Sequence, residues 1–207
     1  MHLTRAESTK KLPIERKTTK YIARALSHKN ESVSIVIAVR DMLKLARTSK
    51  EVKYLIQQKL LKINGREVKD FRESIRLFNI LSAGKQDYKL SILPSGRFSL
   101  METKDKYRLV KVIGKNLLRK KVIQFNLHDG TNFLGNEKIK IGNSLELDFS
   151  GKVKNIIELS KGKNIFIFSG KSIGKIGKIE EVVDKKAKIK LDDKTVELNV
   201  SHLIAIN

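Results

Sequence analysis

Apolar residues at helical spacing predict a first helix around residues 35–46. The positions that repeat at i, i+3, i+7 and i+10 are Val36, Val39, Leu43 and Ala46. This spacing aligns the four side chains in one stripe, which we expect to be buried. The basic residues Arg40, Lys44 and Arg47 repeat at i, i+4 and i+7 on a different face. The pattern therefore predicts a helix with one buried side and one basic side.

A second helix and a hairpin follow directly. Thr48 or Ser49 is a candidate N-cap, because Glu51 then falls in the first turn of a helix over about residues 50–59. Further on, Asn64-Gly65 stands between alternating residues, and this dipeptide is the strongest short signal for a type I′ turn. Two short helices and then a hairpin are therefore expected in this part of the chain.

From about residue 87 the apolar residues repeat every second position, which is the period of a strand. Pro94-Ser95-Gly96 and Asp129-Gly130 mark turns within this region. We therefore expect short antiparallel strands from here to the end of the chain. They are predicted at 88–92, 98–100, 109–113, 122–127, 145–149, 164–168, 179–183, 187–191 and 195–200, with a further turn at Asp192-Asp193.

Composition adds a large positive charge. The chain has 207 residues, with 44 Lys and Arg against 22 Asp and Glu, and its net charge is +22. Like charges repel one another in a compact protein, so we expect a polyanion to neutralise them. Nucleic acid fits best, because each contact of Lys or Arg with a phosphate releases counterions. An anionic membrane surface is the rival partner, but it would require a basic amphipathic helix with bulky apolar anchors.

The sequence also excludes several classes of protein. There is no cysteine, which rules out disulfides, thiolate metal sites and a cysteine nucleophile. No apolar run approaches the roughly 18 residues of a membrane span. The N-terminus lacks the apolar core of a signal peptide. We therefore expect a soluble intracellular protein.

Residues 1–32 are rich in basic positions and poor in apolar ones, and Pro13 interrupts any helix there. Such a segment buries too little surface to offset the entropy lost on ordering it. We expect it to be mobile or to fold on a partner, and a disordered solubilising tail is the alternative.

No group of residues forms a convincing catalytic or metal site. The four histidines are dispersed, without the spacing of metal ligands. His128-Asp129 resembles an acid–base pair, but it lies at an expected hairpin tip, and neighbours along a strand point to opposite faces. Ser169-Gly170-Lys171-Ser172 lacks both the first glycine of a phosphate-binding loop and the helix that must follow it. We therefore expect no cofactor, no metal and no enzymatic activity.

Three glycines, Gly170, Gly174 and Gly177, punctuate a loop that also carries lysines. Glycines at this spacing let the backbone come close to a phosphate or to another chain. They can equally turn the corners of a tight barrel. The pattern leaves both interpretations open.

Three motifs occur in one order, and together they resemble a known family. Residues 48–68, which hold the predicted second helix and the hairpin, resemble the alpha-L RNA-binding domain. Residues 124–132, Gln-Phe-Asn-Leu-His-Asp-Gly-Thr-Asn, resemble the central signature of the archaeal and eukaryotic-type ribosomal small-subunit protein four. Residues 165–179 resemble the KOW motif that closes proteins of this family. Residues 12–17 resemble its basic N-terminal segment, although the Trp expected before Pro13 is absent.

The resemblance implies an α+β fold that is mostly β. It divides the chain into a basic N-terminal extension (1–32), an alpha-L domain of helices plus hairpin (33–82), a central β domain (83–158) and an SH3-like KOW barrel (159–207). It further implies a structural constituent of the small ribosomal subunit in the cytoplasm. Its partners would be folded ribosomal RNA and neighbouring ribosomal proteins, with no membrane and no small-molecule substrate.

The resemblance and the charge pattern together nominate RNA-binding residues. The alpha-L surface would use the start of the second helix and the hairpin, namely Ser49, Lys50, Lys53, Lys62, Asn64 and Arg66. The charge pattern adds Arg40, Lys44 and Arg47, and the glycine-punctuated loop adds Lys171 and Lys175. Lys and Arg would contact phosphates, while Ser49 and Asn64 would contact RNA backbone or 2′-hydroxyl groups. Because aromatic residues are few in these loops, we expect base stacking to be minor and recognition to depend on shape and charge.

Two other functions compete with this one. An alpha-L enzyme such as a pseudouridine synthase needs a large catalytic domain with an active Asp, whereas residues 83–207 have the pattern of small β modules. A KOW-containing transcription or RNA-processing factor is the second alternative. It would co-purify with a polymerase rather than with ribosomes.

Overall fold

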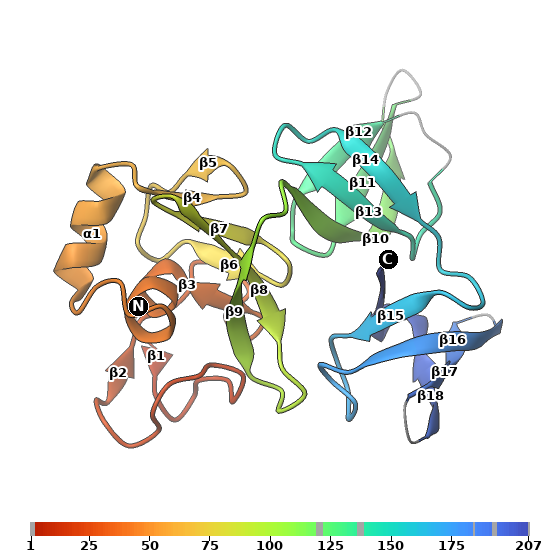
Figure 1. Ribbon diagram of the computed structural model, residues 1–207, viewed down its shortest axis with the longest axis horizontal. Coiled ribbons are helices and arrows are strands. Elements are labelled where there is room, and N and C mark those ends of the chain that lie inside the picture. The colour runs from red at the N-terminus through yellow and green to blue at the C-terminus, as the bar shows by residue number, and fades with distance from the viewer. Residues whose placement is uncertain (1–2, 119–121, 136–138, 184, 192–193, 207) are drawn as a thin grey trace. The chain divides into compact units, whose positions relative to one another are not determined.

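The computed structural model describes residues 3–118, 122–135, 139–183, 185–191 and 194–206. The chain divides into two compact units, Met1–Asp105 and Lys106–Asn207 (Figure 1). Both units are mostly β with few helices, which confirms the predicted class.

The first unit is built around a five-stranded sheet with the order β5-β4-β7-β8-β9, in which every pairing is antiparallel. Two smaller pairs, β1-β2 and β3-β6, accompany it. The elements are β1 (Leu3–Thr4), β2 (Tyr21–Ile22), β3 (Ser32–Ser34), η1 (Ile37–Met42), α1 (Ser49–Gln57), β4 (Leu61–Ile63), β5 (Arg66–Glu67), β6 (Ser74–Arg76), β7 (Ile80–Ala83), β8 (Gln86–Ile92) and β9 (Phe98–Thr103).

The main sheet of the first unit crosses the expected domain boundary. Position 82, where the resemblance ends the alpha-L domain, lies inside β7, and β7 pairs with β8. The turn around Pro94-Ser95-Gly96 then joins β8 to β9 as predicted. Residues 83–105 therefore extend the same sheet that begins at the Asn64-Gly65 hairpin, because each new strand satisfies the open edge of the previous one.

The first predicted helix is wrong in its extent. The structure contains only η1, a short π-helical segment in which the N–H of Leu43 donates to the carbonyl of Ala38, five residues earlier, at 2.9 Å. Lys44 then has a φ of +55°, which ends the helix. All residues of the run 35–39 are at most 1% exposed. Because every position of this run is buried and apolar, some of its apolar residues also fall at helical spacing, although no long amphipathic helix forms.

The second helix and the hairpin are confirmed. Thr48 caps α1, since its Oγ1 accepts the N–H of Glu51 at 3.3 Å, and the Glu51 carboxylate accepts the N–H of Arg47 at 2.7 Å. These two side chains satisfy backbone donors that a helix start leaves free. In the hairpin, Asn64 and Gly65 have φ values of +49° and +78°, as a type I′ turn requires.

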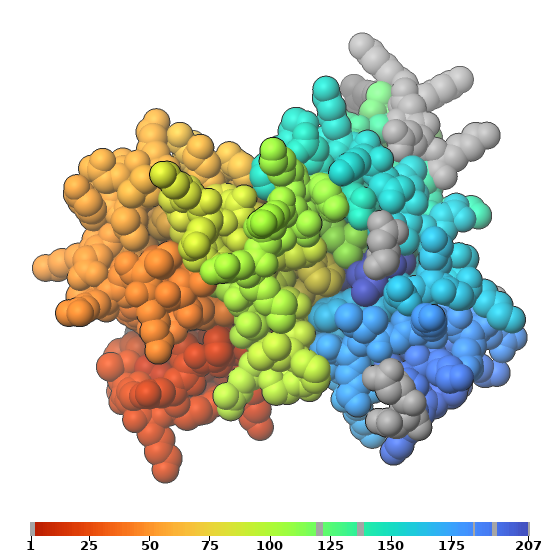
Figure 2. Space-filling view, viewed as in Figure 1, coloured from red at the N-terminus to blue at the C-terminus, as the bar shows by residue number. Residues whose placement is uncertain are grey.

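Residues 3–32 differ from the prediction of a mobile segment, because they pack onto the first unit. The buried apolar side chains of residues 3–32 are Leu3, Leu12 and Ala25. The carbonyl of Lys11 accepts the N–H of Phe98, at the start of β9, at 2.8 Å. Figure 2 shows the red atoms of the first residues against orange and yellow-green atoms of the same unit. Few apolar residues are sufficient here, because they are buried against an existing sheet and need no core of their own.

The second unit contains two five-stranded antiparallel sheets, with the orders β12-β11-β10-β13-β14 and β18-β17-β16-β15-β19. The predicted strands between 109 and 200 are found, and β12, β14 and β19 are additional. The turn expected at Asp192-Asp193 lies outside the described residues. The elements are β10 (Tyr107–Leu117), β11 (Ile123–Leu127), β12 (Asn132–Gly135), β13 (Ser144–Asp148), β14 (Val153–Ile157), β15 (Asn164–Ile167), β16 (Ile176–Val183), β17 (Lys186–Lys190), β18 (Thr195–Asn199), η3 (Val200–His202) and β19 (Leu203–Ile206).

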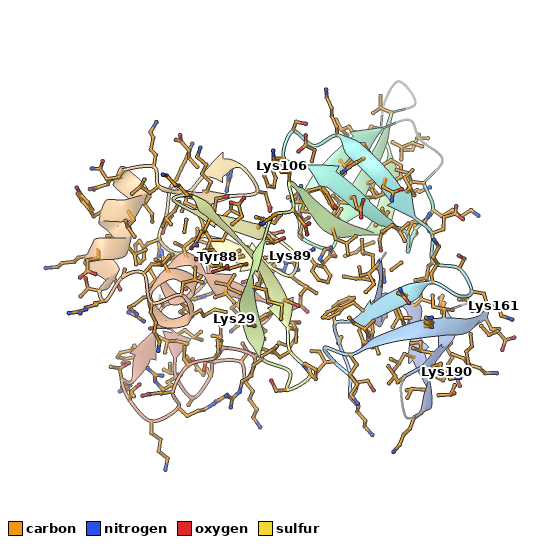
Figure 3. All side chains as sticks on the ribbon, viewed as in Figure 1. Lys29, Tyr88, Lys89, Lys106, Lys161 and Lys190 are labelled. Carbon is orange, nitrogen blue, oxygen red and sulfur yellow. The ribbon has the colours of Figure 1, made fainter. Side chains whose placement is uncertain are left out.

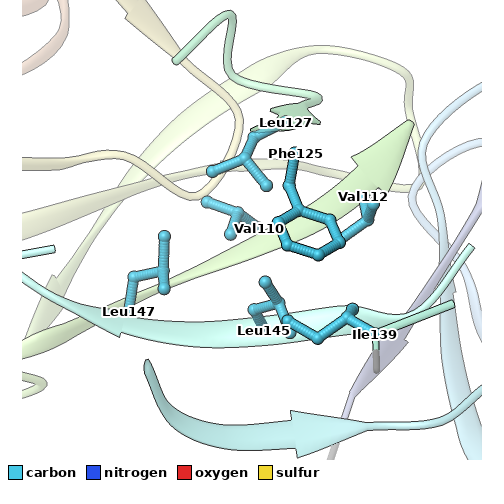
Figure 4. Close-up of a cluster of buried hydrophobic side chains, with 7 residues drawn as sticks. All are labelled: Val110, Val112, Phe125, Leu127, Ile139, Leu145 and Leu147. Atoms are coloured by element: carbon cyan, nitrogen blue, oxygen red, sulfur yellow. The ribbon is translucent and has the colours of Figure 1, made fainter. Parts of the chain in front are cut away.

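A bulge in β10 shapes the first of these sheets. The register of β10 against β11 shifts between Val112 and Gly114. Residues 107–111 of β10 pair with β13, and residues 112–117 pair with β11. Such a bulge bends a strand and lets one sheet wrap around its own core. The enclosed side chains are Val110, Val112, Phe125, Leu127, Ile139, Leu145 and Leu147 (Figure 4).

Lys111, just before this bulge, links the two sheets of the second unit. Its side chain is buried, and its Nζ donates to the carbonyls of Val200 at 2.5 Å and Ser201 at 3.2 Å, both in η3. Burial disfavours the charged ammonium and lowers the pKa of Lys111 to about 8.

Candidate RNA-binding surface

Helix α1 presents its basic residues to solvent. Val52 is fully buried and fixes the packed side of the helix. Lys50 and Lys53 are exposed, as predicted, and Ser49 is half-buried. The Oγ of Ser49 accepts a long hydrogen bond, 3.4 Å, from Nη1 of Arg40. The capped start of α1 therefore holds two ammonium groups on a rigid element.

The loop over residues 68–73 brings the helix and the hairpin together. The Nζ of Lys53 lies 4.7 Å from the ring centroid of Phe71 in this loop, which is the range of a cation–π contact. From the hairpin, Nη2 of Arg66 lies 2.7 Å from Oε2 of Glu73. Cations from two separate elements thus converge on one loop, and no pattern in the sequence indicates these two contacts.

Asn64 has a structural role that sequence reasoning missed. Its Oδ1 accepts the N–H of Ile80 at 2.9 Å, and its own N–H donates to the Ile80 carbonyl at 2.8 Å. Asn64 therefore anchors the hairpin tip to β7, and this holds the neighbouring Arg66 and Lys62 in place. Lys62 and Arg66 are exposed. A contact of Asn64 with RNA stays a prediction.

The basic stripe predicted for the first helix does not form, because η1 ends before Lys44. Arg40 is paired with Asp41 through two hydrogen bonds of 2.8 Å, and this pairing raises the pKa of Arg40. The side chains of this pair are only 32% and 28% exposed, so the charge of Arg40 is largely neutralised, whereas the side chain of Arg66, which pairs with Glu73, is 71% exposed. Lys44 and Arg47 are exposed in the segment between η1 and α1. These three residues share no helix face, and only Lys44 and Arg47 remain as cations beside α1.

Lys171 and Lys175 are exposed in the loop between β15 and β16, in the second unit. Gly170 and Gly174 in this loop have positive φ values, as turning positions do. At Gly177, a Cβ atom would lie 2.8 Å from the carbonyl oxygen of Lys190 in β17. The glycines therefore turn the loop and allow close packing of the chain on itself.

His128 and Asp129 are buried parts of the β11–β12 hairpin. Nδ1 of His128 accepts the N–H of Lys111 at 3.0 Å. The Asp129 carboxylate bonds the guanidinium of Arg108 and accepts the N–H of Thr131 at 3.0 Å. These bonds close the turn onto β10, so both residues serve the structure of the hairpin, in agreement with the turn interpretation.

The described residues include no cluster of three or more His, Asp or Glu that could hold a metal ion. No helix in this part of the chain is long and apolar enough to cross a membrane. What the surface offers is a set of exposed ammonium and guanidinium groups on a capped helix, a hairpin and a glycine-rich loop. These features define a class: a basic, mostly β protein with surfaces suited to a polyanion.

Comparison with known proteins narrows this class. A family model described as Ribosomal family S4e matches residues 85–154. Small ribosomal subunit protein eS4 of Methanocella arvoryzae is 30% identical over 188 residues, covering 87% of this chain and 80% of that protein. The protein of the same name from Methanospirillum hungatei is 32% identical over 191 residues, covering 87% and 79%. The chain belongs to the eS4 family of ribosomal proteins.

The fold agrees with this family. The crystal structure of the 30S ribosomal protein S4e from Thermoplasma acidophilum matches with a TM-score of 0.73 and 22% identity, over 86% of this chain and 96% of that one. The resemblance inferred from the motifs is confirmed. Because the relatives are ribosomal proteins, a non-enzymatic family, the expectation that the chain is not an enzyme is confirmed as well, and the pseudouridine synthase alternative is dropped.

Proposed function

We propose that the chain is a structural constituent of the small ribosomal subunit in the cytoplasm, where it binds and stabilises folded ribosomal RNA through its basic surfaces. One structural observation supports RNA binding in addition to membership of the family. Lys53 of α1 and Arg66 of the hairpin converge on a single loop, so that their cations are held at fixed positions. Fixed cations suit RNA that is recognised by its shape.

Both units contribute charge. Residues 1–105 hold 23 of the 44 Lys and Arg, and residues 106–207 hold the other 21, while each unit has 11 of the 22 acidic residues. Lysines at the surface are visible on both, among them Lys29 in the first unit and Lys161 and Lys190 in the second (Figure 3). We therefore propose that each unit contacts RNA.

Within this function, the helix α1 and the β4–β5 hairpin serve as the alpha-L surface, and the β15–β16 loop serves as the KOW contact. The proposed phosphate ligands are Lys44, Arg47, Lys50, Lys53, Lys62, Arg66, Lys171 and Lys175. Ser49 and Asn64 are the proposed contacts to backbone or 2′-hydroxyl groups, in addition to their contacts within the protein. Neighbouring ribosomal proteins are the remaining proposed partners.

The salt dependence of binding tests the proposal. If about six phosphates are engaged, affinity for small-subunit ribosomal RNA falls roughly a thousandfold between 50 and 200 mM salt. A nearly flat plot of log K against log salt would contradict the proposal.

A matched pair of variants tests the location of the contacts. Lys50→Glu combined with Lys53→Glu removes two proposed contacts, and each lost contact reduces the salt slope by about 1. Lys85→Glu combined with Lys104→Glu makes the same change of charge at two other exposed sites of the same unit. The first double variant is expected to bind much more weakly and with a flatter salt dependence. Equal losses in the two would show that only net charge matters.

Cell fractionation separates this function from the remaining alternative. On a sucrose gradient the protein is expected to follow small subunits. Co-purification with an RNA polymerase instead would favour a transcription factor.

A further inference from the structure

Two aromatic side chains of the first unit are exposed, and one of them lies on the basic helix α1. All eight Phe and four Tyr of the chain lie in its described part, and ten of these twelve are buried or half-buried. The two exposed rings are those of Tyr21, at 47%, and Tyr54, at 60%. Tyr54 belongs to α1, the helix that carries Lys50 and Lys53.

The helical period places Tyr54 on the basic side of α1. At 3.6 residues per turn, four side chains fall within an arc of roughly 100°, on the side opposite Val52. They are Lys50, Lys53, Tyr54 and Gln57, and all four are exposed. Residues four positions apart on a helix are surface neighbours, so the ring of Tyr54 lies beside the side chain of Lys50.

An exposed ring beside ammonium groups has the composition of a stacking platform for nucleic acid. Aromatic side chains stack on unpaired bases, and adjacent cations hold the backbone of the same strand. Tyrosine suits this role, because it offers a large rigid surface with only two side-chain torsions to immobilise. A ring left in water otherwise gives up the free energy of burial that ten of the twelve aromatic residues of this chain obtain at least in part.

We propose that Tyr54 stacks on an unpaired base of the ribosomal RNA, and that Lys50 and Lys53 hold the phosphates next to that base. This inference rests on the proposed function and deepens it. It amends the expectation that base stacking is minor, because it adds one base contact at a defined point of α1.

Fluorescence tests the contact directly. The chain contains no Trp, so Tyr54→Trp introduces a single indole at this position. We expect its fluorescence to be quenched when small-subunit ribosomal RNA is added, and not when a fully base-paired RNA duplex is added. The control is Met101→Trp, at a site in β9 of the same unit that is 49% exposed, where no quenching is expected. Equal quenching at both sites, or none at position 54, would overturn the inference.

Affinity measurements separate stacking from charge. Tyr54→Ala is expected to lower the affinity for this RNA about tenfold, equal to about 1.4 kcal/mol. Tyr54→Phe keeps the ring and is expected to bind as the unchanged protein does. Stacking releases no counterions, so Tyr54→Ala keeps the salt slope, whereas Lys50→Ala reduces it by about 1. Ala is a better helix former than Tyr, so α1 stays folded in Tyr54→Ala, which circular dichroism checks.

Failure of this inference can be told from failure of the proposed function. If Lys50→Ala flattens the salt dependence while Tyr54→Ala binds normally, stacking is refuted and the proposed function stands. If the unchanged protein shows no salt dependence and neither variant matters, both are refuted. If Tyr54→Ala binds free RNA normally but fails to enter small subunits, Tyr54 contacts a neighbouring protein, and the stacking assignment is wrong.

Discussion

The replacement of Asn64 by Ala separates the construction of the hairpin from its contacts with RNA. Asn64 has a φ of +49°, and its Oδ1 accepts the N–H of Ile80 at 2.9 Å. Ile80 is 0% exposed, so no water reaches that N–H when the acceptor is removed. Asn64→Ala therefore removes a buried hydrogen bond and also places alanine in a left-handed conformation.

The expected loss of stability is the sum of these two effects. A buried donor without a partner costs about 1–3 kcal/mol. The left-handed conformation costs a residue with a Cβ atom roughly 1–2 kcal/mol, and Asn tolerates it better than Ala. We expect Asn64→Ala to lower the free energy of unfolding by roughly 3 kcal/mol. Urea titration followed by circular dichroism measures this change, and an unchanged m-value would show that the loss belongs to the folded state.

Two control variants show whether the loss of stability comes from the missing acceptor and the left-handed conformation at position 64. Asn64→Asp keeps an acceptor oxygen and the tolerance for positive φ, so most of the stability is expected to remain. Arg66→Ala removes a side chain that is 71% exposed, and Glu73 keeps its bond from the N–H of Lys69, so the cost is below about 1 kcal/mol while RNA affinity falls. The reasoning is refuted if Asn64→Ala is as stable as Asn64→Asp, or if Arg66→Ala loses as much stability as Asn64→Ala.

Three further predictions follow from single contacts. Thr48→Ala removes the cap of α1 and is expected to cost about 1 kcal/mol in thermal unfolding, while Thr48→Ser restores it; equal melting of the two would contradict the capping role. Gly177→Ala brings a Cβ atom to 2.7 Å from Ile189 and is expected to cost about 1–3 kcal/mol in urea unfolding. For Lys111, burial lowers the native pKa from 10.5 to about 8, so between these values the native state binds fewer protons than the unfolded chain and stability rises with pH. The unfolding free energy of the unchanged protein, measured relative to Lys111→Met, is therefore expected to increase by about 1.4 kcal/mol per pH unit over that range, and a constant difference would refute this.

Local chemistry allowed several elements to be predicted from the sequence alone. The cap of α1 depends on Thr48 and Glu51, which are three residues apart. The turn at Asn64-Gly65 depends on the ability of two neighbouring residues to adopt positive φ. The strands after residue 87 show their period within a few residues each. All of these signals act over short distances along the chain, and the net charge, which needs no structure, indicated the class of partner.

Contacts between distant residues decided the rest, and no local pattern encodes them. The run 35–39 is buried on all sides by the packing of the unit, so its apolar spacing could not show where η1 ends. Asn64 is tied to Ile80, sixteen residues away, and the side chain of Lys111 is tied to Val200, eighty-nine residues away. β8 and β9 join the sheet of the hairpin because an open edge accepts any strand with a compatible face. The sequence by itself thus determined the capped helix, the turn, the strands and the charge. The tertiary structure alone decided which of the cations stay exposed and which, like Lys111, are buried, because burial depends on residues that only folding brings together.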